Sequence, residues 1–212
     1  KKKWQKAAAY VLISAFGLIM LYPLIWMVFA SVKPSSEVLS SPSLLPSQFH
    51  PENFLEGWTM VRPYTFAKFF GNTFFLVISC VLCSLAISLF AGYAFARIDF
   101  RFKTFWYSIL FLTIMLPATT TLVSRYVIFS EFGWLNTYLP FIVPAVLGVG
   151  NGGAFFIYLV AQFIRGIPRE LDEAAKIDGC STLNIILRII LPLSKPSLFS
   201  VAIFAFMWNW DD

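Results

Sequence analysis

Long apolar runs alternate with short polar stretches along the whole chain. Each run is long enough to cross the hydrocarbon core of a bilayer as a helix, which needs about 20 residues. There are five such runs, over residues 7–30, 72–96, 104–122, 139–163 and 185–208. The pattern predicts an all-α fold, a polytopic transmembrane helical bundle over residues 7–212, after a basic segment over residues 1–6.

The polar stretches predict the connections between these spans. Residues 31–70 are rich in Pro and Ser and predict a loop with short helices near 51–58 and 64–70. Residues 97–103 predict a tight basic turn, and residues 124–138 predict a short, semi-polar loop.

Two of the apolar runs have unusual features. The first follows four lysines, as a cleaved signal peptide would, but its length and the absence of a small-x-small cleavage site favour a retained helix. The fourth is interrupted by Pro140, Pro144 and a glycine-rich patch over residues 148–153. The patch permits either close helix packing or a flexible segment.

Composition supports a membrane protein and argues against several other classes. Hydrophobic residues make up 58% of the chain and charged residues only 13%, about half the usual charged fraction of a soluble domain. The basic residues flank the apolar runs instead of gathering on one face, so nucleic acid is not an expected partner. The single histidine, His50, precedes a proline in a polar loop, and Cys80 and Cys83 lie within an apolar run. We therefore expect no metal site and no redox site.

The distribution of Lys and Arg predicts the orientation in the membrane. Twelve lie in the N-terminal segment, the turn at 97–103 and residues 165–195, and four lie on the alternate side. Because basic residues are enriched in cytoplasmic loops, the N-terminus and residues 165–184 are expected to face the cytoplasm.

A polar, mixed-charge segment at residues 165–184 separates the last two apolar runs. Its residues from Glu170 to Ile177 favour helix, with Pro168 suited to the helix start and Gly179 to a left-handed stop. Ser181 or Thr182 can cap a following helix. The segment predicts a helix–turn–helix at the membrane surface, either resting on lipid headgroups or receiving a soluble partner.

The spacing within this segment favours a soluble partner. Glu173-Ala-Ala175 is followed after three residues by Gly179, and after nine more by Ile189 and then Leu191-Pro192. This order resembles the EAA loop of the permease subunits of bacterial ABC importers. Further stretches resemble the maltose-type, carbohydrate branch of that family. They are Ala91–Arg97 with Phe100, Met115–Pro117, Ile167–Gly179, Leu191–Pro196 and Trp208-Asn209, so the resemblance extends from about Leu21 onward.

The resemblance implies the fold and function of a type I ABC importer permease. It implies a multi-pass protein of the bacterial cytoplasmic membrane that forms half of a carbohydrate path with a second permease subunit. The implied partners also include two ATP-binding-cassette ATPase subunits, which bind ATP and Mg²⁺, and an extracytoplasmic solute-binding protein. No cofactor and no catalytic residue are expected in this chain. The family has six spans, so five spans here imply that the chain is truncated at its C-terminal side.

The resemblance also implies candidate site residues. The ATPase-coupling residues are Glu170, Glu173, Ala174, Ala175, Asp178 and Gly179. In this set Glu173 is the charged contact, the two alanines are the packing face and Gly179 makes the turn. For Asp178, support of that turn and a solvated charge at the helix end are equally open.

Substrate-path candidates come from polar residues in mid-span, which are costly in a bilayer. They are Asn151, Tyr158 and Asn209, each with helix–helix hydrogen bonding as the alternative role. Two other functions remain open. One is an ABC permease for another solute, such as an amino acid or a polyamine. The other is an ion-driven secondary transporter, which would require carboxylates within the spans.

Overall fold

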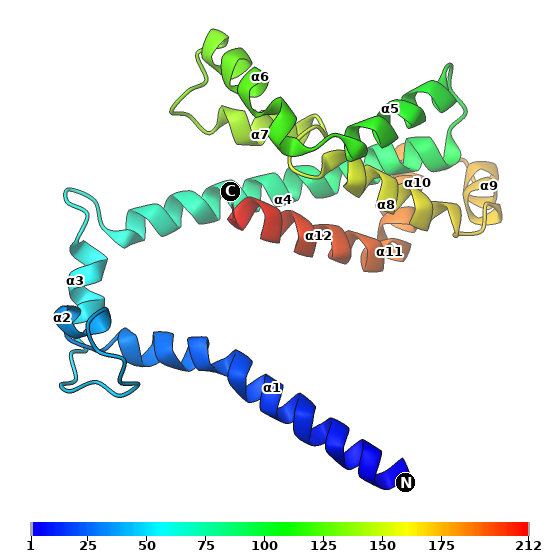
Figure 1. Cartoon of the computed structure of the whole chain (residues 1–212). Helices are drawn as coiled ribbons and strands as arrows, with labels where there is room; N and C mark the ends of the chain where they lie inside the picture. The colour runs from blue at the N-terminus through cyan, green and yellow to red at the C-terminus, as the bar shows by residue number, and fades with distance from the viewer. Residues whose placement is uncertain (1, 212) are drawn as a thin grey trace. The chain divides into compact units, whose positions relative to one another are not determined.

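The computed structural model describes residues 2–211, without the side chains of Lys2 and Ala118, and these residues form helices and connecting loops with no strand. The predicted bounds at residues 1 and 212 lie outside this described part. The chain divides into two compact units, residues 1–70 and 71–212. The helices follow one another along the chain as coloured in Figure 1.

The first unit contains α1 (Lys2–Ala30), α2 (Ser35–Val38), α3 (Asn53–Thr59) and the first turn of α4 (Phe66–Arg97). The second contains the rest of α4 and the helices that follow it. These are α5 (Lys103–Met115), α6 (Ala118–Glu131), α7 (Leu139–Val146), α8 (Gly153–Arg165), α9 (Glu170–Ile177), α10 (Thr182–Ile185), the π-helical η1 (Ile186–Ile190), α11 (Leu191–Leu193) and α12 (Lys195–Trp210).

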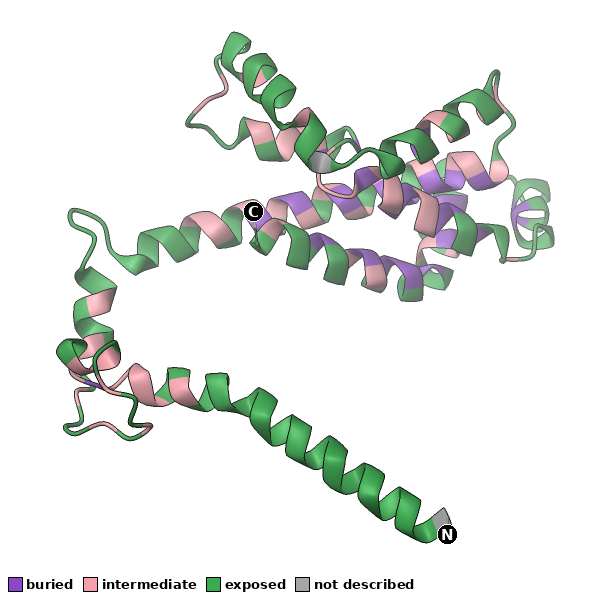
Figure 2. Cartoon of the chain, viewed as in Figure 1, coloured by how far each residue is buried: buried purple, intermediate pink, exposed green. Residues whose placement is uncertain are grey.

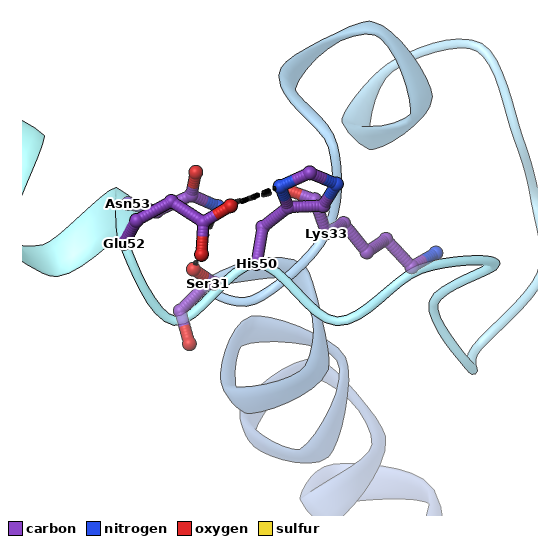
Figure 3. Close-up of polar contacts among 5 residues, drawn as sticks. All are labelled: Ser31, Lys33, His50, Glu52 and Asn53. Atoms are coloured by element: carbon purple, nitrogen blue, oxygen red, sulfur yellow. Dashed lines mark hydrogen bonds and ion pairs between the residues drawn. The ribbon is translucent and has the colours of Figure 1, made fainter.

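The loop after α1 is organised by side-chain contacts to the backbone. The Asn53 amide donates to the carbonyl oxygens of Ser31 at 3.2 Å and Lys33 at 2.8 Å. Lys33 is fully buried, and its ammonium donates to the Ser43 carbonyl. His50 pairs with the Glu52 carboxylate at 2.5 Å (Figure 3). The predicted loop at 31–70 is therefore ordered by a small polar network.

Glu37 completes this network. Its carboxylate accepts from the Ser47 hydroxyl at 2.6 Å and from the Ser47 N–H at 3.1 Å. These two hydrogen bonds, with a smaller contribution from the Lys33 charge, hold the pKa of Glu37 below its usual range. An ionised Glu37 thus ties α2 to the residues that lead toward α3.

The core of the second unit is built on a stripe of small residues along α4. Cys80, Ser84, Ser88, Gly92 and Ala96 recur every four residues, and all are buried (Figure 2). A Cβ at Gly92 would lie 2.9 Å from the Val160 side chain of α8. Small residues at this spacing let two helix backbones approach closely, which is how membrane helices pack without a hydrophobic driving force.

Helices α8 and α12 supply the larger side chains of this core. Phe156, Val160 and Ile164 recur at helical spacing on α8 and are fully buried. Val201 and Ala205 of α12 belong to the same cluster. α8 also packs against α5 and α12, so it lies at the centre of the second unit.

The predicted apolar runs do not all form single helices. The first two correspond to α1 and α4, whereas the third is bent by 105° between α5 and α6. The fourth breaks into α7 and α8, and the fifth is bent by 79° before α12. Within the described residues, two helices are long and apolar enough to cross a membrane, or up to four if each bent pair is one span. The assignment of five spans stays a prediction.

One predicted loop is helical in the structure. Residues 124–131, expected as the start of a loop, continue α6, which begins directly after Pro117. The prediction for these residues was wrong because semi-polar composition does not distinguish a loop from a helix with polar positions. Pro117 has the extended backbone of an N-cap residue, and a proline there loses no helical hydrogen bond.

Candidate functional site

The predicted polar helix is α9, which begins at Glu170 after the N-cap Arg169, so Pro168 precedes the helix and does not open it. Glu170, Asp172 and Glu173 occupy the first turn, where negative charge suits the helix dipole. Gly179 adopts a φ of +79°, and the Cys180 N–H donates back to the Ala175 carbonyl at 2.9 Å. This left-handed stop ends the helix as predicted.

A second helix then begins at a capped end. The Ser181 hydroxyl accepts a hydrogen bond from the Asn184 N–H at 3.3 Å, so Ser181 is the N-cap of α10. The helix–turn–helix expected at residues 165–184 is therefore confirmed, and Ser181 is the cap that the sequence left open.

The two faces of α9 differ sharply. Asp172 and Ala175 are turned into the second unit and are 4% and 7% exposed. Five of the predicted coupling residues are exposed, namely Glu170, Glu173, Ala174, Asp178 and Gly179. Ile177 lies beside them and is 87% exposed. The outward face thus combines carboxylates, a small residue and an apolar side chain.

Ala175 does not share the outward face predicted for it. It belongs to the buried core cluster with Ala96 of α4 and Ile185 of α10. Consecutive helical residues are about 100° apart around the axis, so Ala174 and Ala175 present different surfaces. Of the two alanines, only Ala174 is available to another protein.

The inward face carries an ion pair that the sequence did not reveal. The Asp172 Oδ2 lies 3.1 Å from the Arg97 Nε at the end of α4, and the two side chains are 6% and 5% exposed. Arg97 also donates to the Ile167 carbonyl in the segment that leads into α9. The sequence assigned Asp172 no role in packing, because nothing local indicates a partner so distant in the chain.

Two cavities lie in the second unit near the break between α7 and α8. One has a volume of about 570 Å³ and includes Trp208 and Asp211 in its lining. The other has a volume of about 380 Å³ and includes Asn209. Arg125, Gly150 and Asn151 line both. Amide and guanidinium groups in a mostly apolar wall can donate hydrogen bonds to a polar solute.

The structure separates the three predicted substrate-path residues. Asn151 and Asn209 meet at the smaller cavity. Tyr158 instead packs its ring against Phe111 of α5, with the ring centroids 5.0 Å apart. Neither of the two cavities is lined by Tyr158.

Arg125 was not predicted as a site residue, because residues 124–138 were expected to form a loop. It lies in α6, which places it on the cavity wall. The threonines that precede it, Thr119 and Thr121, also line one cavity each, so a cluster of polar residues before Arg125 was the available signal. Within the described residues, no group of three His, Cys, Asp or Glu side chains could hold a metal ion.

The glycine-rich patch beside these cavities is a site of close packing. Gly148 and Gly152 adopt φ values of +71° and +74°. A Cβ at Gly152 would lie 2.0 Å from the Trp208 ring, and one at Gly153 would lie 2.3 Å from the Gly148 carbonyl oxygen. Of the two roles left open for the patch, packing is the one observed.

Known proteins resemble this chain along its length. Residues 84–212 match the family described as "Binding-protein-dependent transport system inner membrane component". The chain is 31% identical to the probable ABC transporter permease protein YurM of Bacillus subtilis, over 100% of this chain and 69% of that protein. It is 28% identical to the diacetylchitobiose uptake system permease protein NgcG of Streptomyces coelicolor, over 97% of this chain and 66% of that protein.

A relative and a solved structure extend the comparison. The arabinooligosaccharides transport system permease protein AraQ of Halalkalibacterium halodurans is 29% identical, over 100% of this chain and 76% of that protein. A chain from the crystal structure of a bacterial ABC transporter involved in the import of the acidic polysaccharide alginate superimposes with a TM-score of 0.81. That chain is 21% identical, and the match covers 99% of this chain and 71% of that one, so the fold is shared.

The chain spans about two thirds to three quarters of the length of these relatives. The matched residues 84–212 include the stripe of α4 from Ser84 onward, both cavities and α9 with its buried ion pair. On this evidence the chain belongs to the family of binding-protein-dependent transport system inner membrane components, the permeases of ABC transporters.

Proposed function

We propose that this chain is the permease subunit of an ATP-driven importer for a carbohydrate. It would form half of the translocation path with a second permease subunit, and an extracytoplasmic binding protein would deliver the solute. The oligosaccharide permeases among its relatives support the solute class. The outward face of α9 is the observation that carries the proposal, because its exposed carboxylates, Ala174 and Ile177 could contact another protein.

The partner proposed for α9 is an ATPase subunit. Glu170, Glu173 and Ala174 would make the contact, with Ile177 as an apolar anchor. Asp178 and Gly179 would end the helix and keep it short and stiff. ATP and Mg²⁺ would bind to the two ATPase subunits, and this chain would hold no cofactor. The Lys and Arg distribution supports a cytoplasmic N-terminus and a cytoplasmic α9.

The proposed solute contacts lie at the two cavities. Asn151 and Asn209 would donate amide hydrogen bonds to sugar hydroxyls, and Arg125 would add a guanidinium. One N–H of the Asn209 amide is already engaged, since the amide nitrogen donates to the Ala205 carbonyl at 2.7 Å. Tyr158 is left out of this set because it packs against α5.

Charge reversal tests the docking role. The complete transporter is expressed with Glu173→Arg, and co-purification of the ATPase subunit is measured after membrane insertion is checked. We expect at least a roughly tenfold loss, because an arginine would bring a repulsive or unpaired charge to the interface. Glu56→Arg, an exposed glutamate of α3, is the matched control. Normal co-purification of the Glu173→Arg transporter would refute the docking role.

Uptake measurements test the solute class. Cells that express the complete transporter are supplied with labelled oligosaccharides and, separately, with labelled amino acids. Oligosaccharide uptake that requires ATP and falls in an Asn151→Ala variant is the expected result. Uptake driven by an ion gradient in the absence of the ATPase would overturn the proposal.

A further inference from the structure

We propose that the buried pair Arg97–Asp172 is a clamp that joins α9 to the end of α4, so that the two helices move as one body when α9 is displaced. The inference rests on the proposed docking of α9. It assigns positioning roles to two residues that make no contact with the docking partner.

Arg97 holds α9 at two points. Its Nε lies 3.1 Å from the Asp172 Oδ2 in the first turn of α9. Its terminal nitrogen donates to the Ile167 carbonyl, just before α9 begins. A guanidinium carries several donors in a fixed, planar fork, so it can hold both groups at once. One side chain of α4 therefore fixes both the entry into α9 and its first turn.

The surroundings make this pair hard to separate. Tyr93 and Ala96 of α4 are each 2% exposed, and Ala175 of α9 belongs to the same buried cluster. Asp172 Oδ1 and Arg97 Nε are both buried and have no hydrogen-bond partner among the described residues, so the two groups are joined as an ion pair. The Arg97 charge therefore helps to compensate for burying this carboxylate, and pulling the two groups apart would leave both charges without their ion-pair partner.

A second ion pair, in the connection between α4 and α5, provides a contrast. The Lys103 ammonium lies 3.3 Å from the Asp99 carboxylate, which is 92% exposed. Water screens such a pair, and its contribution is usually small. Asp99 is therefore the natural control for Asp172, since it is also an aspartate paired with a basic residue, in this case Lys103 at the start of α5.

The clamp allows a displacement of α9 to reach the other helices of the second unit. The outward face of α9 is open to a partner, whereas its inward face is tied to α4 by the ion pair and by Ala175. α4 in turn contacts α8 through Gly92 and Val160. A displacement applied to α9 would therefore be transmitted to packed helices instead of bending the short connections at residues 166–169 and 178–181.

Spin-label distances test the clamp in the complete transporter. Labels are placed at Ile98 and Ile177, both exposed, with Cys83 and Cys180 changed to serine. Distances are measured without nucleotide and with ATP and vanadate. In the unaltered background we expect one narrow distribution that is the same in both states. In Asp172→Asn we expect the distribution to widen about twofold and to differ between the states. Asp99→Asn should match the background.

The variants also distinguish a failure of the clamp from a failure of the docking role. If Asp172→Asn does not assemble, Arg97→Lys tests the clamp instead. Lysine keeps the positive charge but cannot hold both the Asp172 carboxylate and the Ile167 carbonyl, so this variant should also widen the distance distribution. An unchanged distribution in the variant that assembles would overturn the clamp. Normal ATPase co-purification by Glu173→Arg would instead overturn the docking role, which is a different outcome in a different assay.

Discussion

Two segments of the second unit interrupt the apolar pattern, and they do so for opposite physical reasons. The segment around α9 is polar, yet it contributes one of the most deeply buried carboxylates, Asp172. The patch at residues 148–153 is rich in glycine, and it lets the Trp208 ring approach the backbone at Gly152. Packing of the α9 segment depends on the pairing of two opposite charges, whereas packing of the glycine-rich patch depends on the absence of a side chain.

The comparison shows how differently the two segments should respond to substitution. At α9 the damage should come from leaving a charge unpaired, so it should be relieved by removing the partner charge as well. At the patch the damage should come from overlap with a rigid ring, so charge should have no influence. Four substitutions test this distinction, and all are read as the thermal unfolding of the solubilised protein.

Removing one charge of the clamp should have the largest effect. Asp172→Ala leaves the Arg97 guanidinium buried without its partner, and we expect a loss of about 3–5 kcal/mol. The double variant Arg97→Met with Asp172→Leu should recover most of this loss, because both charges are then gone. A double variant that is as unstable as the single one would show that the charge is not the cause.

Adding one methyl group at the patch should be the next largest effect. Gly152→Ala places a Cβ within 2.0 Å of the Trp208 ring at a φ of +74°. Left-handed backbone strain and overpacking together should cost about 2–4 kcal/mol. If Gly152→Ala no longer destabilises the protein that also carries Arg97→Met and Asp172→Leu, then the effect at the patch depends on the charges of the clamp, which contradicts the prediction.

The same substitution at the end of α9 should be milder. Gly179 has a φ of +79°, but nothing lies within 4 Å of the position that a Cβ would take. Gly179→Ala should therefore show only the backbone strain, about 1–2 kcal/mol. If Gly179→Ala is as damaging as Gly152→Ala, then the approach of the Trp208 ring does not explain the effect at Gly152.

Loss of the cap of α10 should be the smallest effect. Ser181→Ala removes the acceptor for the Asn184 N–H, and typical caps contribute about 1 kcal/mol. Thr182→Ala, at the adjacent exposed position, should have less effect because its hydroxyl is not the cap. A larger loss in Thr182→Ala than in Ser181→Ala would show that the cap is misassigned.

Much of α9 could be predicted because its signals are local. Acidic residues near the helix start, the glycine at its end and the serine cap act on neighbouring backbone groups. The burial of Ala175 and the packing of Tyr158 against α5 could not be predicted from local signals. Which face of a helix is buried depends on the packing partner, and the partners lie on α4, α10 and α5.

The sequence by itself determined that the chain is helical and apolar, where its polar interruption lies and how that helix starts and stops. These properties follow from hydropathy, spacing and capping within a few residues. Only the tertiary structure decided that Asp172 pairs with Arg97, that Arg125 lines the same cavities as Asn151, and that Gly152 meets Trp208. Each of these contacts joins segments that are far apart in the sequence, and their approach depends on the packing of the whole unit, which no local pattern encodes.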